Sequence, residues 1–400
     1  MDTAKQIAVG VVLPIVAVFG LELLYRDTLF ETTLRDVPLM QAKGKLRPLM
    51  ENISTVGGMP ATFFVLVVAS NLMSKPAAFY LISGVLFVQY MTEALKSFYL
   101  QPRPFWVSDS ISSSQCLLGY GNPSRHLLSN TFLWTTIYLH KYYDIGVKTK
   151  KMSVFCTAYI IKMALTSVGF VYLVLMMCSR VYLGAHSWNQ AFFGASLGVS
   201  IAIIGHRSVK PWFYELWTRS LGENRYNINF SEVFRMGYFI APFVLASLIL
   251  LTVRLDQVPS YLKDPYDRQD WEIRMANAGC SDLQVSSFPN STTLGAFTSL
   301  NWFTYPLVGL LCQFLEWHLL VNTGKLNSSV WKAHQTSPLL TLSRIVLTFC
   351  LLGLSVLPYF LTRRNGELCL LVATVVQMGL LRGFFHWLKL DASDSLGKEF

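Results

Sequence analysis

The chain has 400 residues, of which 52% are hydrophobic and only 14% are charged. A soluble domain carries about 25% charged residues, so this composition excludes an ordinary soluble protein. The 27 Phe, 18 Tyr and 10 Trp residues exclude a disordered chain, which cannot keep that much apolar bulk in water. The class that remains is an all-α polytopic membrane helix bundle. The net charge of +10 does not predict a nucleic-acid partner, because the basic residues gather in the loops between apolar stretches.

Ten apolar stretches are long enough, or nearly so, to cross a bilayer, which takes about 20 helical residues. In chain order they are roughly Ile7–Leu24, Gly58–Met73, Ala77–Leu95, Leu127–Leu139, Val154–Met177, Ala191–Ile204, Val233–Leu251, Phe297–Val321, Leu339–Phe360 and Leu368–Leu388. We expect a six-helix core over residues 1–206, a basic loop at 207–232 and a four-helix extension over 233–400. Gly194 and Gly198 in the sixth stretch have the spacing of a small-residue packing face.

The charges of the loops predict the orientation of the chain. Residues 140–152 and 206–235 are rich in Lys and Arg, and short basic loops face the cytoplasm. The large loop 254–296 is acidic, carries a glycosylation acceptor at Asn290 and falls on the other side, as does a second acceptor at Asn52. Both acceptors favour the endoplasmic reticulum or another secretory-pathway membrane, with the mitochondrial inner membrane as the open alternative.

The seven cysteines do not predict a metal centre or a disulfide framework. Five of them lie in or beside apolar stretches, and no pair has the spacing of a zinc site. We therefore expect no metal and no cofactor. Cys116 and Cys280 fall in polar loops, and whether these two residues form a bridge stays open.

Three polar clusters interrupt the apolar pattern, and the topology puts all three on the non-cytoplasmic face. The first cluster, residues 96–104, ends the third stretch and contains Lys96 and Arg103. The second, residues 121–126, precedes the fourth stretch, and the third, residues 179–190, joins the fifth stretch to the sixth. Segments that are distant in the sequence therefore bring several cations and two histidines to one membrane face.

These residue types suit phosphoryl transfer. Lys96, Arg103 and Arg180 can neutralise phosphate oxygens, and an arginine does so with two donors at once. A neutral histidine can attack phosphorus, and a second one can protonate the leaving oxygen near neutral pH, which suits His126 and His186. Taken singly, each cation could anchor a helix end and each histidine could cap a helix. Together, in order and on one face, they favour a site.

The three clusters resemble the tripartite signature of the type-2 phosphatidic acid phosphatase superfamily. That signature reads Lys-x6-Arg-Pro, then Pro-Ser-Gly-His, then Ser-Arg-x5-His-x3-Asp, and its members include lipid phosphate phosphatases and glucose-6-phosphatases. The resemblance covers roughly the first six stretches. The matching residues are Lys96, Arg103, Pro104, Pro123, Ser124, His126, Ser179, Arg180 and His186.

The resemblance implies a role for each of these side chains. His186 would be the nucleophile that forms a phosphohistidine, and His126 would be the general acid that releases the alcohol. Cations would take the place of a metal ion in neutralising charge. The phosphate would be held by Lys96, Arg103, Ser124, Arg180 and the backbone amide of residue 125.

Two residues depart from the signature. Arg125 replaces the glycine, and its guanidinium could block the phosphate pocket, bind phosphate as a fourth cation or point to water. If the loop needs a positive φ there, a side chain costs about 1–2 kcal/mol. Gln190 replaces the aspartate, and from four residues after His186 its carbonyl oxygen could accept the ring N–H and orient the nucleophile. Glu93, three residues before Lys96, is expected to neutralise that lysine.

The expected function is that of an integral membrane phosphatase that hydrolyses a phosphomonoester. A lipid phosphate of the phosphatidic acid or sphingoid-base phosphate type is the first choice of substrate, because a site between helices is open to a diffusing amphiphile. A sugar phosphatase like glucose-6-phosphatase is the first alternative, since those enzymes resemble the segment up to Gln190 and carry the same glutamine. The second alternative is a catalytically impaired member that serves as a subunit of a membrane complex or binds lipid. The expected partners are therefore membrane lipids and a phosphorylated substrate.

Overall fold

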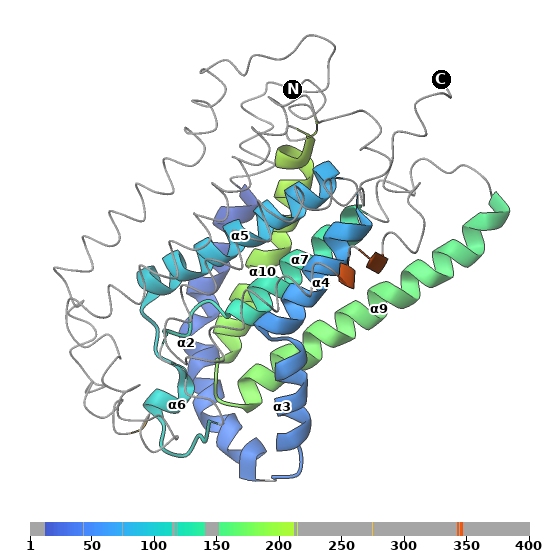
Figure 1. The fold of residues 1–400 in the computed structure, drawn as a ribbon. Coiled ribbons are helices and arrows are strands. Elements are labelled where there is room, and N and C mark those ends of the chain that lie inside the picture. Colours follow the sequence, from blue (N-terminus) through green and yellow to red (C-terminus); the bar gives the residue numbers. More distant parts are fainter. Residues whose placement is uncertain are drawn as a thin grey trace, which may run out of the picture. The chain divides into compact units, whose positions relative to one another are not determined.

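The computed structural model describes residues 13–42, 44–73, 75–113, 117, 119–140, 152–211, 214, 274, 342–343 and 345–346. Within these ranges all regular structure is helical (Figure 1), which confirms the all-α class. The chain divides into two compact units. Unit 1 comprises Met1–Thr62, Met91–His206 and Ala246–Leu300, and unit 2 comprises Phe63–Tyr90, Arg207–Leu245 and Asn301–Phe400.

Six of the helices coincide with the first six apolar stretches of the sequence. In chain order the helices are α2 (Leu13–Ala42), α3 (Arg47–Val56), α4 (Met59–Leu72), α5 (Lys75–Tyr99), α6 (Pro104–Val107), α7 (Arg125–Tyr138), α9 (Met152–Tyr182), α10 (Trp188–Ile204) and the π-helix η3 (Gly205–Val209). Of the last four stretches the structure describes only residues 342–343 and 345–346. Nearly all of both large loops, and Cys116 and Cys280, lie outside the described residues. The predicted domain boundaries and the number of membrane spans stay predictions.

Helix α2 extends further than its apolar stretch predicts. The stretch ends at Leu24, but α2 continues to Ala42. Thr33 and Val37 are fully buried, four residues apart on one face of the added turns. The residues after Leu24 therefore form a helix with one buried face, although they contain no continuous apolar run. Helix α3 is amphipathic as well, and it also lacks a long apolar run.

Within unit 1, α10 packs most extensively on α7 and next on α2, while α3 packs on α9. Gly194 and Gly198 make the contact with α7 close. A Cβ atom on Gly194 would lie 2.8 Å from the carbonyl oxygen of Ser124, and one on Gly198 would lie 2.5 Å from that of Leu128. The predicted small-residue face therefore sets α10 directly against the start of α7. The buried apolar cluster beside this contact consists of Val37, Phe105, Trp106, Ile111, Leu127, Met176, Val181 and Ala191.

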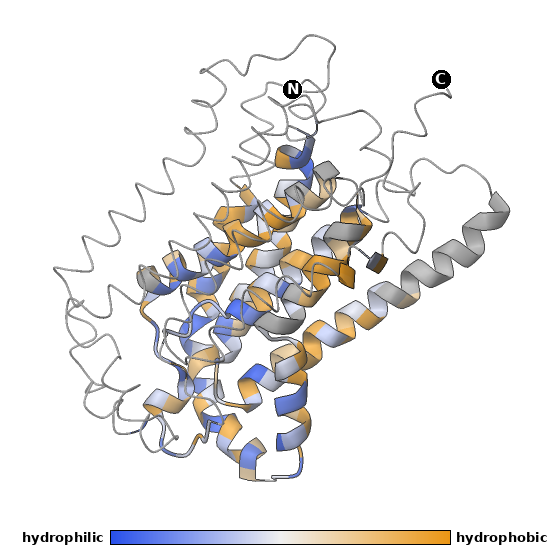
Figure 2. Cartoon of the chain, in the orientation of Figure 1, coloured by the Kyte–Doolittle hydropathy of each residue, from blue (hydrophilic) through white to orange (hydrophobic). Residues whose placement is uncertain are grey.

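Part of the helical surface is apolar and exposed. Leu24 on α2 is 80% exposed and Phe170 on α9 is 67% exposed, and other large apolar side chains on these helices are similarly open. Figure 2 shows the contrast between the hydrophilic residues of α3 and the mostly apolar described part of α9. Among the described helices, Trp188–Val209 is long and apolar enough to cross a bilayer. Exposed apolar surface of this extent marks a contact with lipid or with another protein.

Candidate active site

The first motif places two cations in the interior of unit 1. Lys96 lies in the last turn of α5 and Arg103 precedes α6, and both side chains are buried. The guanidinium of Arg103 donates to the carbonyl oxygens of Gly119 and Ala185, each at 2.6 Å, and of Tyr120 at 3.3 Å. Carbonyl groups orient the guanidinium without cancelling its charge. The positive charge of Arg103 is therefore available to an anion.

A left-handed glycine shapes the third motif. Helix α9 ends at Tyr182, and Gly184 follows with a φ of +65°, a conformation that glycine adopts without strain and that commonly ends helices. The turn brings the backbone N–H of His186 to 3.2 Å from the carbonyl oxygen of Arg180. The arginine and the histidine of this motif are thereby held together across the turn.

The His186 ring is fixed through both of its nitrogens. Nδ1 lies 2.9 Å from the carbonyl oxygen of Gly121, and Nε2 lies 3.4 Å from Nη1 of Arg103. A carbonyl can only accept and a guanidinium can only donate, so the proton sits on Nδ1 and the lone pair on Nε2. The ring is 2% exposed. The nitrogen with the lone pair therefore faces a buried cation.

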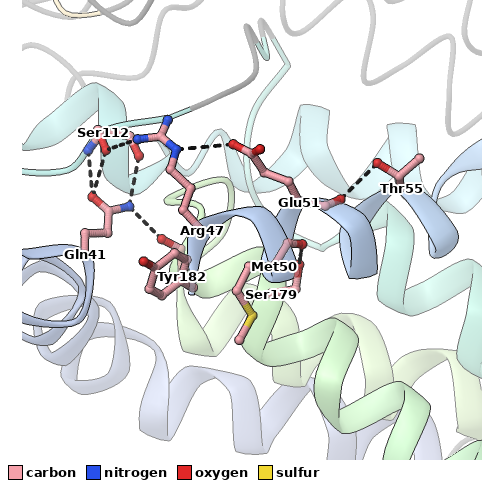
Figure 3. Close-up of polar contacts among 8 residues, drawn as sticks. All are labelled: Gln41, Arg47, Met50, Glu51, Thr55, Ser112, Ser179 and Tyr182. Carbon is pink, nitrogen blue, oxygen red and sulfur yellow. Dashed lines mark hydrogen bonds and ion pairs between the residues drawn. The ribbon is translucent and has the colours of Figure 1, made fainter. Parts of the chain in front are cut away.

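Helix α3, which the apolar pattern does not predict, holds the end of α9. The Ser179 hydroxyl donates to the carbonyl oxygen of Met50 at 2.6 Å (Figure 3). Next to it, the Arg180 guanidinium donates to the Ser54 hydroxyl at 2.6 Å. Ser54 is buried and belongs to the glycosylation acceptor at Asn52, which the structure places in a helix rather than in a loop. Ser54 is thus a positioning partner of Arg180.

Gln41 at the end of α2 connects the first motif to the third. Its amide nitrogen donates to the carbonyl oxygen of Tyr182 at 2.6 Å and to that of Ser112 at 2.9 Å, and its oxygen accepts the backbone N–H of Ser112 (Figure 3). Ser112 follows the first motif, and Tyr182 belongs to the third. No feature of the sequence marks Gln41 for this role, because the contacts depend on the extra turns of α2.

The second motif forms the start of α7. Ser124 is the N-cap, and its backbone N–H donates to the carbonyl oxygen of Gln190 at 3.0 Å. Its hydroxyl is buried without a partner in the part of the chain that the structure describes. Arg125 is the first helical residue, and among the described non-glycine residues only Leu100 has a positive φ. The backbone strain considered for Arg125 therefore does not arise.

The side chain of Arg125 forms an ion pair with Glu93. The Nζ atom of Lys96 lies 3.6 Å from the same Oε1 atom of Glu93. The predicted neutralisation of Lys96 by Glu93 is thus present, and Arg125 shares the carboxylate. The structure therefore shows a position of the Arg125 guanidinium that is none of the three considered from the sequence, because it is turned toward a protein carboxylate.

The contact predicted between Gln190 and the His186 ring is wrong. The Gln190 oxygen accepts the backbone N–H of Ser187 at 3.2 Å, and its amide nitrogen donates to the carbonyl oxygen of Pro102 at 2.8 Å. The side chain therefore completes a capping box at the start of α10, which competes with a bond to the ring. The Gly121 carbonyl orients His186 instead. A Cβ atom on Gly121 would collide with the Gln190 side chain, so Gln190 supports the ring only through Gly121.

The charges of Lys96, Arg103 and Arg180 act on both histidines, and that of Arg125 acts on His126. Burial lowers the pKa of His186 well below its usual value, and the charges of Arg103, Arg180 and Lys96 lower it further. Burial and the charges of Arg180 and then of the other cations do the same to the pKa of His126. The pKa of Arg103 is also lowered by burial and by Arg180. Both imidazoles are therefore neutral at neutral pH while no anion is bound.

The structure adds a buried carboxylate beside the second motif. Glu22 of α2 is fully buried, and its Oε1 atom accepts a hydrogen bond from Nδ2 of Asn122 at 3.0 Å. Nε of Arg26 lies 3.9 Å from the same atom. Glu22 thereby holds the residue that precedes Pro123 and Ser124. A lone carboxylate inside an apolar stretch was the signal that could have found it.

The site is thus a buried cluster of cations around two neutral histidines. Within the described residues no group of three or more His, Cys, Asp or Glu side chains is arranged to hold a metal ion. Residues 77–214, which include all the predicted site residues, match the family model described as the PAP2 superfamily. This segment is therefore similar to the PAP2 superfamily. The match supports phosphatase activity for the PAP2 segment. No curated protein and no solved structure matches the chain.

Proposed function

We propose that the protein is an integral membrane phosphatase that hydrolyses a lipid phosphomonoester through a phosphohistidine at His186. The observation that carries this proposal is the state of the His186 ring. Its Nδ1 proton is bound to a carbonyl oxygen, and its Nε2 lone pair lies beside the Arg103 guanidinium. A neutral imidazole fixed in this way is a competent nucleophile, and the adjacent cation attracts the phosphate that it attacks.

The proposed reaction has two displacements at phosphorus. Nε2 of His186 attacks, the bond from phosphorus to the alcohol oxygen breaks, and His126 gives that oxygen a proton. Water then attacks the phosphohistidine while His126 takes a proton from it, so that phosphate leaves and His186 is regenerated. Lys96, Arg103 and Arg180 balance the charge on the nonbridging oxygens in both steps. The free hydroxyl of Ser124 is a further donor to the phosphate.

Two observations bear on the choice of substrate. The exposed apolar side chains of α2 and α9 support contact with a bilayer, which would supply a lipid phosphate to the site by lateral diffusion. A sugar phosphate is the second candidate, favoured by the similarity of residues 179–190 to glucose-6-phosphatases. The ion pair of Arg125 with Glu93 argues against the impaired alternative, because it turns the guanidinium toward a protein group. A secretory-pathway membrane stays the expected location.

The test uses the full chain in detergent with a metal chelator. Phosphate release is measured from phosphatidic acid, a sphingoid-base phosphate and glucose 6-phosphate. We expect release from at least one lipid and none from the His186→Ala variant. Faster turnover of glucose 6-phosphate than of either lipid would move the assignment to the sugar phosphatase. No release from any of the three substrates would favour the impaired alternative.

A further inference from the structure

The Glu93 carboxylate is a part of the cationic cluster that the superfamily signature does not contain. It forms an ion pair with Arg125 from the second motif and lies 3.6 Å from Nζ of Lys96 from the first. The side chains of Glu93, Lys96 and Arg125 are 13%, 7% and 18% exposed. One carboxylate oxygen therefore serves two cations at positions that water reaches poorly, where charge interactions are weakly screened.

The charge of the cluster follows from this sharing. Lys96, Arg103, Arg125 and Arg180 are four cations, and Glu93 is one carboxylate, so the formal net charge is +3 with neutral histidines. Lys96, Arg103 and Arg180 alone would carry the same +3. The arginine that replaces the glycine of the signature is thus matched by a carboxylate that cancels it.

We propose that Glu93 sets how strongly the cluster binds a phosphate group, by pairing with Arg125 and partly neutralising Lys96. This inference rests on the proposed function, because it takes the cluster to be the phosphate site. Removing one member of a buried ion pair leaves the other charge uncompensated. Without Arg125, the Glu93 carboxylate would oppose only Lys96 and would repel a phosphate. Without the Glu93 charge, Arg125 and Lys96 would both be free to donate to the phosphate.

The consequence runs against the superfamily pattern. Changing Arg125 to the glycine of the signature should weaken phosphate binding rather than restore an ideal site. The glycine should be tolerated only when the Glu93 charge is removed as well. Glu93 and Arg125 therefore act as a coupled pair, whose two substitutions are not additive.

The experiment uses calorimetry to measure the dissociation constants of inorganic phosphate and orthovanadate for the 400-residue chain in detergent. We expect Glu93→Gln to tighten binding by about tenfold and Arg125→Gly to weaken it by about tenfold. The double variant should return to within about threefold of the unsubstituted protein. The matched control is Glu51→Gln, which removes a carboxylate whose partner Arg47 is 42% exposed, and which should leave both constants unchanged.

Each result decides a different claim. Unchanged or weaker binding by Glu93→Gln, or tighter binding by Arg125→Gly, overturns the inference while the phosphate site stands. Failure of the unsubstituted protein to bind either anion overturns the proposed function and the inference with it. Arg125→Gln keeps a side chain at the first turn of α7 and should also weaken binding, so the sign is measured even if Glu93→Gln does not fold.

Discussion

The two histidines of the site differ in how they are held. His186 is bound at both ring nitrogens, by the Gly121 carbonyl and by Arg103, and is 2% exposed. His126 lies in the first turn of α7 and is partly exposed. Its ring has no hydrogen-bond partner within the part of the chain that the structure describes. One imidazole is therefore fixed in position and tautomer by hydrogen bonds, while the other is not held in this way.

This difference supports the two roles that we propose for the histidines. A nucleophile gains from being held close to the line of attack, because fixed orientation removes an entropic part of the barrier. A general acid that later acts as a base must reach a leaving oxygen and then a water molecule, which suits a ring that no partner holds. A bound phosphate dianion would also raise the pKa of His126, since a nearby negative charge favours the imidazolium. The proton needed for the first step would thus arrive with the substrate.

The largest effect should come from removing the fixed histidine. His186→Ala eliminates the proposed nucleophile, and we expect the rate of phosphate release to fall by roughly 10⁴-fold or more. The measurement is release from the best lipid phosphate in detergent. His140→Ala, which removes a histidine beyond the other end of α7, is the matched control. A residual rate within tenfold of the unsubstituted protein would contradict the nucleophilic role.

Removing the free histidine should have a smaller effect that depends on the leaving group. His126→Ala is expected to slow release from a lipid phosphate by about 10²–10⁴-fold, the usual contribution of a general acid. When the substrate is an aryl phosphate with an acidic phenol, the leaving oxygen needs little protonation. The rate of release from that substrate should therefore fall much less. The ratio of the two losses is the readout. Equal losses on both substrates would mean that His126 does not protonate the leaving oxygen.

The shared burial of the two rings predicts how stability depends on pH. Burial and the neighbouring cations lower both pKa values in the folded protein, while an unfolded histidine has a pKa of about 6.5. Below that pH the unfolded chain binds protons that the folded chain does not. The contribution of the two histidines to the free energy of unfolding therefore has its full value above about pH 6.5. Below that pH it falls by about 1.4 kcal/mol per pH unit for each histidine.

The readout for this prediction is the midpoint of thermal unfolding in detergent at pH 7.5 and at pH 5.5. The unsubstituted protein should lose stability at pH 5.5, and a variant with asparagine at both histidine positions should lose less. Equal losses in the two proteins would show that other groups control the loss of stability at low pH.

The sequence could predict the class of fold and a set of motif residues whose polar side chains the structure buries, while their role as a site stays a prediction. Six apolar stretches became helices, because a long apolar run has few alternatives to a helix. Cations from the first and third motifs lower the pKa values of both rings. What the sequence could not predict are the amphipathic turns of α2 beyond Leu24 and the helix α3. These helical segments have polar faces, so they contain no long apolar run that would indicate a helix. Gln41 and Ser54, which hold the third motif, lie on these segments and were therefore not predicted.

Local competition explains the other failure. From its spacing, Gln190 could bond either to the His186 ring or to the free backbone N–H at the start of α10. The capping box satisfies a donor that would otherwise stay unpaired in the interior, and Gly121 offers the ring a carbonyl. Spacing alone does not reveal that second acceptor. The direction of the Arg125 side chain likewise depends on a residue of another helix, Glu93 of α5.

The smallest expected effect on the rate is that of Gln190→Ala. This variant distinguishes a role of Gln190 in capping α10 from a role in orienting His186. Gln190→Ala removes the capping box and the bond to Pro102, so it should lower the free energy of unfolding by about 0.5–2 kcal/mol. The Gly121 carbonyl still holds the ring, so we expect phosphate release to fall by less than about tenfold and its pH profile to keep its shape. Unfolding midpoints and pH profiles measure the two effects side by side. A loss of rate of 10³-fold or more with unchanged stability would instead mean that Gln190 orients His186 during the reaction, as its spacing first indicated.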